Sequence, residues 1–251
     1  MCCLWQRLHS VLSLITLTLI LARGDTVMTR RAVRFEQVAG VAAIVFGLSM
    51  VAYFVLFFVA IAANPIKVSG NPADSPERFA DSLIWQAKTP FSLIYLELAL
   101  AAVFGFTIPR AVADRLRVTA PSFAQTSAAF GFGAMALWIL LTLVSFHLNA
   151  AGGSSLTRDE LRQAIPVLFA VVLPGLLGSF DLFAGVWILA VSLAAIRSGG
   201  LSRWLAYFGV LSGLVLIAGM IGQAGTEGVV APWLIWLGIF MLTRPAKTES
   251  P

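Results

Sequence analysis

Two carboxylic acids lie in stretches of the chain that are otherwise apolar, and their chemistry needs an explanation first. Glu97 lies in Leu-Ile-Tyr-Leu-Glu-Leu-Ala-Leu-Ala, and Asp181 lies in Gly-Ser-Phe-Asp-Leu-Phe-Ala-Gly. A carboxylate in hydrocarbon costs at least about 2.5 kcal/mol on insertion scales, so such residues usually face the inside of a helix bundle and have polar partners. Each acid is therefore a candidate for a binding site or for a hydrogen bond between helices.

Small residues recur at helical spacing on the same side as each acid. Ala101 and Gly105 follow the first acid at intervals of four, and Gly178 and Gly185 flank the second at intervals of three and four. Residues three or four apart share one helix face, and small residues on that face let a neighbouring membrane helix approach closely. We expect both acids to lie on helix–helix contact faces.

Both acids are predicted at a similar depth in the membrane. Glu97 comes seven residues after Pro90, and Asp181 comes seven residues after Pro174. Each side chain would then lie about 10 Å from the outer end of its span. Polar residues of other spans are predicted near the same end. We hypothesise that one set of residues lines a polar cavity in the outer half of the bundle: Glu97, His147, Asn149, Asp181 and Gln223. The alternative is that each acid is protonated or hydrogen-bonded on its own and only joins two helices.

Sequence motifs for catalysis and cofactor binding are absent. The chain contains no HExxH, no P-loop and no GxSxG. One histidine, His147, with two acids could hold a metal ion, but a histidine at the end of a span is more often an interfacial residue. We therefore predict no catalytic residue, no metal and no cofactor. The adjacent Cys2 and Cys3 are the only cysteines, so no disulfide framework is expected.

The composition predicts that lipid is the solvent of this chain. Of its 251 residues, 59% are hydrophobic and 12% are charged, and the mean hydropathy is +0.90. Soluble domains carry about 25% charged residues, and a soluble protein of this length could not cover so much apolar surface. The net charge of +5 does not indicate a nucleic-acid partner, because the basic residues are spread over short connectors. The expected fold is an all-α, polytopic transmembrane helix bundle.

Apolar stretches predict about six spans. They form a single transmembrane domain over residues 28–244, with spans at about 38–63, 90–108, 122–148, 174–196, 204–222 and 230–243. Thr157 and Glu160 form a capping box, which predicts an amphipathic lead-in before the prolines and the fourth span. Ser75-Pro76 predicts a short amphipathic helix to Ala87 at the membrane interface, with Phe79, Leu83 and Trp85 facing it, and an ordered loop is the alternative. Residues 245–251 form a charged tail.

Residues 1–27 leave three interpretations open. A charged start and a short apolar stretch from Val11 to Ala22 are typical of a signal sequence. The same stretch could be a further span, although about 20 residues are usually needed. The third interpretation makes these residues an extension ahead of a start at Met28. We favour the third, because Met28-Thr-Arg-Arg-Ala-Val-Arg makes a basic lead into the first span.

The basic residues predict the orientation. Counted from Met28, ten Lys and Arg fall on the same side as the N-terminal end of the domain and five fall on the opposite side. Cytoplasmic loops of membrane proteins carry the excess of Lys and Arg. Both ends of the domain are therefore predicted to be cytoplasmic.

The C-terminal third carries a pattern of glycine and tryptophan that resembles a known group. Gly178 to Gly185 leads through Trp187 to Arg197-Ser-Gly-Gly-Leu-Ser-Arg-Trp-Leu-Ala, and a glycine-rich span leads to Trp233-Leu-Ile-Trp-Leu-Gly. This pattern resembles an uncharacterised family of bacterial six-helix membrane proteins. The resemblance covers residues 38–244 in layout, and its specific residues lie in 178–244. It implies a bacterial inner-membrane location and no particular chemistry.

Three classes of function remain open. The first is a structural or accessory subunit that binds a membrane-protein partner, or a second copy of the chain, through its small-residue helix faces. The second is a small-solute or ion transporter that uses Glu97 and Asp181. The third is an intramembrane enzyme acting on a lipid-linked substrate, with His147 and the acids as acid–base groups. The first class is favoured because the spans contain few polar residues.

Overall fold

The structure is a computed structural model that describes residues 28–66, 75–87, 89, 92–117, 120–154, 157–222 and 226–244. The predictions made for residues 1–27, for Gln223 and for the tail at 245–251 lie outside the described residues. Throughout the described part, every regular element is helical. In chain order the elements are α2 (Met28–Ala63), α3 (Pro76–Ala87), α4 (Ser92–Gly105), α5 (Thr107–Leu116), α6 (Pro121–Ser154), α7 (Arg158–Val167), η2 (Leu168–Val172), α8 (Leu173–Ser198), α9 (Arg203–Gly222), η3 (Glu227–Val229) and α10 (Val230–Thr243).

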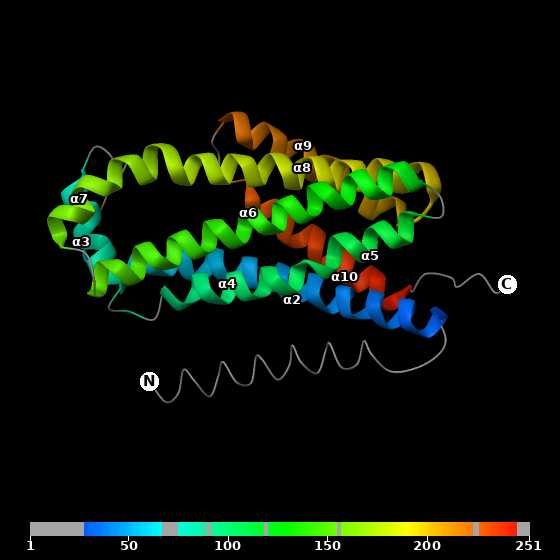
Figure 1. Cartoon of the computed structure of the whole chain (residues 1–251), viewed down its shortest axis with the longest axis horizontal. Coiled ribbons are helices and arrows are strands. Elements are labelled where there is room, and N and C mark those ends of the chain that lie inside the picture. The colour runs from blue at the N-terminus through cyan, green and yellow to red at the C-terminus, as the bar shows by residue number, and fades with distance from the viewer. Residues whose placement is uncertain are drawn as a thin grey trace.

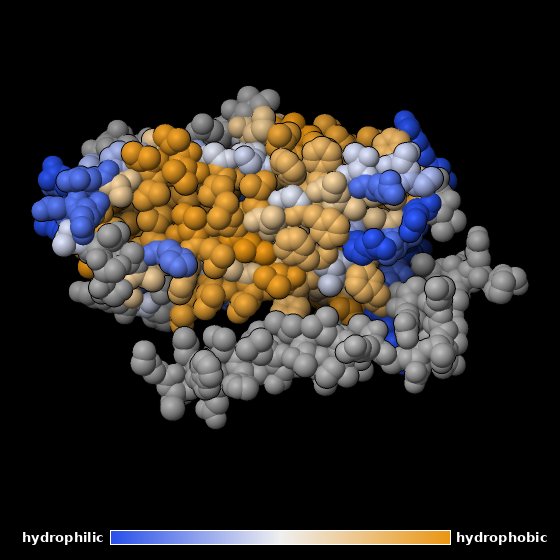
Figure 2. Space-filling model, in the orientation of Figure 1, coloured by the Kyte–Doolittle hydropathy of each residue, from blue (hydrophilic) through white to orange (hydrophobic). Residues whose placement is uncertain are grey.

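The helices form an elongated bundle, and the prediction of an all-α transmembrane fold is confirmed (Figure 1). Among the described residues, five helical segments are long and apolar enough to cross a membrane, and a sixth apolar helix, Glu227–Thr243, is shorter. Figure 2 shows an apolar band across the middle of one face of the bundle, with hydrophilic residues gathered at both ends. Such a band between two polar ends matches the hydrocarbon core and the two interfaces of a bilayer.

The two ends of the bundle differ, and we name them by what they carry. At the basic end lie the start of α2, the ends of α5, α8 and α10, and the start of α9 (Figure 1). The described arginines of these segments give this end its name: Arg34, Arg115, Arg117, Arg197, Arg203 and Arg244. The opposite end of the bundle is formed by α3 and α7, which lie together beside the end of α6 (Figure 1). We call it the capped end.

Two exposed ion pairs join the two helices of the capped end. Arg158 of α7 pairs with Asp81 of α3 at 2.6 Å, and a second ion pair joins the same helices nearby. Thr157 and Glu160 form the predicted capping box at the start of α7. The predicted helix after Ser75-Pro76 is also confirmed.

The apolar side of α3 faces the bundle. Leu83 is buried in a cluster with Leu161 and Ile165 of α7, and the ring of Phe79 packs edge to face against Phe169, with centroids 4.4 Å apart. The expectation that Leu83 touches the membrane interface is therefore wrong, whereas Phe79 and Trp85 are half-buried. Hydrophobic partners on α7 draw Leu83 inward, and Phe79 packs on η2.

Two helices continue beyond their predicted ends. The second apolar segment was expected to stop before Pro109-Arg110, but after a turn at Phe106 the chain continues as α5 to Leu116. Pro109 lies in the first turn of α5, where a missing N–H has no intrahelical partner to lose. The side chains of Ile108 and Val112 of α5 are buried in the core. The other helix, α6, runs to Ser154 rather than ending near residue 148, and its contacts include α3.

A π-helical turn carries the chain from α7 to α8. Pro174 has no N–H for the carbonyl four residues earlier, and its ring would clash with that carbonyl in an α-helix. The turn at Leu168–Val172 widens, and the N–H of Leu173 bonds to the carbonyl of Leu168, five residues back. The predicted lead-in and the fourth span are therefore joined near the prolines by a locally widened turn. Residues Arg158–Ser198 form one segment of 41 residues.

The α9–α10 hairpin reaches only about half-way along the bundle (Figure 1). With 20 residues, α9 is about 30 Å long, whereas the 41 residues of α7, η2 and α8 extend about 60 Å. Glycines hold the hairpin against its neighbours. A Cβ on Gly238 of α10 would lie 2.4 Å from the carbonyl oxygen of Gly40, and one on Gly213 of α9 would lie 2.8 Å from that of Gly185. The predicted contact face at Gly185 is confirmed, and these backbones can meet only at glycine.

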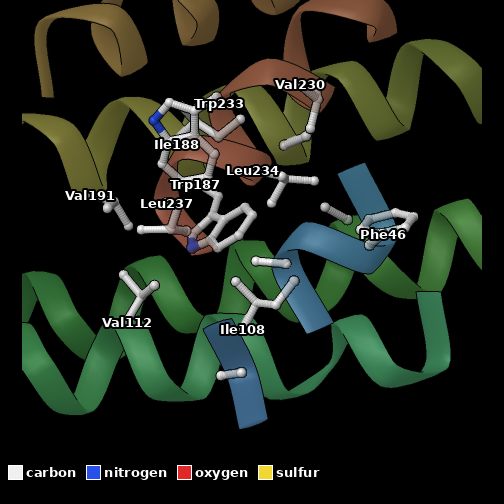
Figure 3. Close-up of a cluster of buried hydrophobic side chains, with 14 of the residues drawn as sticks. Phe46, Ile108, Val112, Trp187, Ile188, Val191, Val230, Trp233, Leu234 and Leu237 are labelled. Carbon is white, nitrogen blue, oxygen red and sulfur yellow. The ribbon is translucent and has the colours of Figure 1, made fainter. Parts of the chain in front are cut away.

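Large side chains fill the basic half of the bundle. Trp187 of α8 and Trp233 of α10 meet edge to face, with centroids 5.5 Å apart and planes at 83° (Figure 3). Ile108 of α5 and Phe46 of α2 lie in the same buried cluster. Trp187 and the helix α10 with Trp233 occupy the space between the long helices here, and the cavity described below lies towards the capped end.

Candidate functional site

A cavity of about 480 Å³ lies in the capped half of the bundle, where the hairpin ends. Side chains of α2, α4, α6, η2 and α8 form its walls, and α3 contributes Phe79, Leu83 and Gln86. Gly219 and Met220, near the end of α9, line its floor. The fold explains the cavity: five helical segments continue past a hairpin that does not.

Asp181 is the acid at the floor of this cavity. Its side chain lines the cavity, although the residue is only 2% exposed. The hydroxyl of Thr226, in the hairpin turn, donates to Asp181 Oδ2 at 3.3 Å, while Oδ1 has no hydrogen-bond partner among the described residues. A Cβ on Gly219 would lie 2.0 Å from Thr226 Oγ1. Glycine at position 219 therefore lets Thr226 reach the acid.

A second carboxyl group, that of Glu227, lies beside the first. Glu227 begins η3, is 5% exposed, and is close enough to Asp181 for the two groups to repel each other. Glu227 Oε1 is buried and has no hydrogen-bond partner in the part of the chain that the structure describes. Asp181, which lines the floor of the cavity, therefore has a second buried carboxyl group close to it, although Glu227 itself is not among the lining residues.

One face of α6 brings further polar groups into the wall. Thr142, Ser145 and Asn149 all line the cavity and recur at three and four residues. The amide nitrogen of Asn149 donates to the carbonyl of Ser145 at 2.8 Å, and Asn149 Oδ1 is buried without a described partner. The rings of Tyr53 and Tyr95 pack edge to face, with centroids 5.8 Å apart. Helices α2, α4 and α6 therefore all contribute polar side chains to the cavity wall.

The structure separates the residues of the predicted cavity. Asp181 and Asn149 line the same cavity, whereas Glu97 and His147 are exposed on the outside of the bundle and do not line it. Glu97 accepts a hydrogen bond from the hydroxyl of Ser49. A ring nitrogen of His147 lies 2.9 Å from the carbonyl oxygen of Leu143 on its own helix. Gln223 is outside the described residues.

Sequence reasoning missed several polar residues of the site. Tyr53, Gln86 and Tyr95 line the cavity but were not singled out, and neither was Glu227, which lies close to Asp181. The spacing of Thr142, Ser145 and Asn149 is visible in the sequence as a polar face on an apolar helix. This pattern was the one that could have indicated the α6 side of the cavity. The tyrosines gave no such signal, because single tyrosines are common in membrane helices near the interface.

The site has the composition of a binding site. Its described polar groups are carboxyls, amides and hydroxyls, set among aromatic and aliphatic side chains. In the same described part, no group of three or more His, Cys, Asp or Glu residues is arranged to hold a metal ion. Comparisons of the chain with protein-family models, with curated proteins and with solved structures find no match. The geometry of the cavity is therefore the main guide to function.

Proposed function

We propose that this protein is a membrane carrier that binds a small solute in the cavity of the capped half. The observation that carries the proposal is Asp181, an acid that is buried, lines a cavity of about 480 Å³, and has one oxygen without a described partner. Buried polar groups are normally hydrogen-bonded, and leaving one unsatisfied costs free energy. A cavity of this size with a few converging polar groups is typical of small-molecule sites.

The position of the cavity along the bundle supports carriage of a solute. Asp181 comes 17 residues before Ser198, the last residue of α8, so it lies about 26 Å from the basic end. We infer that the basic end is cytoplasmic, because arginines gather there, and that the cavity lies towards the outer surface. The proposed location is the inner membrane of a bacterium, in keeping with the resemblance of residues 178–244.

Binding of a solute can be tested without knowing its identity. We expect at least one class in a panel of amines, amino acids, sugars and carboxylates to raise the thermal unfolding midpoint of the protein in nanodiscs by about 5 °C or more at saturation. Proteoliposomes that contain the protein should take up the same class.

Two glycines of α8 provide a matched pair of variants for this test. Gly178 lines the cavity, so Gly178→Phe should fill it and abolish both stabilisation and uptake. Gly175→Phe adds the same ring at a position where a Cβ meets nothing within 4 Å. This variant should retain both the thermal stabilisation by solute and the uptake. Failure of every class to stabilise the wild type, or stabilisation that persists in Gly178→Phe, would show that the cavity is not a solute site.

An accessory-subunit function has one observation in its favour. Glu97 is exposed between Leu93 and Leu100 on the apolar surface of α4, where a donor from a partner helix would lower its cost. Such a partner should co-purify in stoichiometric amount after mild detergent extraction, and Glu97→Leu should release it.

A further inference from the structure

The charge balance of the cavity points to a positively charged ligand. Asp181 lines its floor, the buried carboxyl group of Glu227 lies close to Asp181, and the described lining residues include no Lys, Arg or His. Carboxylates in a cleft with low-dielectric walls focus a negative potential that concentrates cations. An anion would meet repulsion at the floor, and it would find no basic side chain among these lining residues.

The unsatisfied atoms of the site point to a ligand that donates hydrogen bonds. Asn149 Oδ1, Asp181 Oδ1 and Glu227 Oε1 are each buried without a described partner, and all three are acceptors. Asp181 and Asn149 line the cavity from α8 and α6. An N–H group carrying a positive charge would satisfy such oxygens with charge-assisted hydrogen bonds, which are stronger than neutral ones.

The walls of the cavity point to an organic cation. Aromatic side chains from five helical elements line it: Tyr53, Phe57, Phe79, Tyr95, Trp138 and Phe169. Aromatic faces attract cations, and they also cover the apolar part of an amphipathic ligand. The volume of about 480 Å³ lies in the range of cavities that hold organic ligands. A bare inorganic cation would leave most of this space and these rings unused.

We propose that the cavity binds a small organic ammonium compound with an aromatic or branched apolar body. The ammonium group lies at the floor with Asp181, near Glu227 and within reach of the α6 polar face, and the apolar body lies among the aromatic rings towards α3. This inference rests on the proposed function, because it names the solute class of the same cavity.

The probes are three soluble molecules that share one phenyl ring. They are phenethylammonium chloride, the uncharged 2-phenylethanol and the anionic 3-phenylpropionate, titrated calorimetrically into the full chain in nanodiscs of zwitterionic phosphatidylcholine. Phenethylammonium should bind at least about tenfold more tightly than 2-phenylethanol, because only its head group is charged. 3-Phenylpropionate should show no binding.

Two carboxylate variants locate the charge. Asp181→Asn should weaken phenethylammonium at least about tenfold. Asp159→Asn removes an exposed acid of α7 outside the cavity lining, and it should leave the affinity within about twofold. The probe comparison on the wild type stands by itself if Asp181→Asn fails to fold.

The outcomes separate this inference from the proposed function. Equal binding of phenethylammonium and 2-phenylethanol, or unchanged affinity in Asp181→Asn, overturns the ammonium class. Binding of 2-phenylethanol or 3-phenylpropionate alone, removed by Gly178→Phe, overturns the class while the solute carrier stands. No binding of these probes, together with no stabilisation by any class of the panel, overturns both.

Discussion

Replacing Arg115 with alanine should destabilise the protein by about 3–5 kcal/mol, the cost of removing one partner of a buried ion pair. Its guanidinium pairs with Glu36 of α2, and both side chains are largely buried. It also donates to the carbonyls of Gly200 and Arg244 and lies 4.7 Å from the centre of the Phe240 ring. One side chain of α5 therefore ties α2, the α8–α9 turn and the end of α10 together at the basic end.

The same helix offers a control for Arg115→Ala. Arg110 pairs with Asp114 on the exposed surface of α5, and exposed pairs contribute below about 1 kcal/mol. Arg110→Ala should therefore change the free energy of unfolding, measured by steric trapping in bilayers, far less than Arg115→Ala does. Similar losses in the two variants would show that the Arg115 contacts do not hold the basic end together.

Replacing Glu97 with leucine should stabilise the protein and leave solute binding intact. Glu97 is exposed on the apolar surface of α4 beside Leu93 and Leu100. On insertion scales a charged residue at mid-span differs from leucine by about 3 kcal/mol, and the lost hydrogen bond from Ser49 offsets about 1 kcal/mol of that gain. The free energy of unfolding in bilayers and the affinity for the stabilising solute are the two measurements.

The Glu97→Leu variant distinguishes two arrangements of the binding site. In the structure Glu97 lies outside the cavity, whereas in the sequence-based hypothesis Glu97 and Asp181 act together in a transporter. Glu97→Gln is the conservative companion variant, and it too should keep uptake. A large loss of solute affinity or uptake in either variant, with normal folding, would show that Glu97 takes part in solute binding. That result would contradict the cavity described above, which Glu97 does not line.

Much of the fold could be predicted from the sequence, because membrane helices follow from apolar length and from caps. The helix from Pro76 to Ala87 and the capping box at Thr157 appear as expected. The half-length hairpin could not be predicted, because the 20 residues of α9 are as long as an ordinary span. The turn lies at mid-bundle because Gly213 packs on Gly185 and Gly238 packs on Gly40. Which glycines contact each other cannot be predicted from their positions in the sequence.

The site was predictable in part, for a related reason. Helical spacing put Asp181 on a face with Gly185, and that face does contact α9. The same argument put Glu97 on a face with Ala101 and Gly105. Ala101 is buried and Gly105 approaches Met135 and Phe46, but Glu97 itself is exposed. Helical spacing identifies residues that share one side of a helix. A residue at the margin of that side, such as Glu97, can still face lipid. Only the positions of neighbouring helices decide between these environments.

Thiol labelling measures directly whether water and solutes reach the cavity from the capped end. Ser145 lines the cavity from α6, and Ser192 of α8 is fully buried in the basic half. Each would be changed to cysteine after Cys2 and Cys3 are replaced with serine, and a membrane-impermeant maleimide would be added to intact cells and to inside-out vesicles. We expect Ser145→Cys to be labelled in intact cells, and Ser192→Cys to stay unlabelled from both sides. No labelling of Ser145→Cys from either side, or labelling only in inside-out vesicles, would contradict an outward-facing solute cavity.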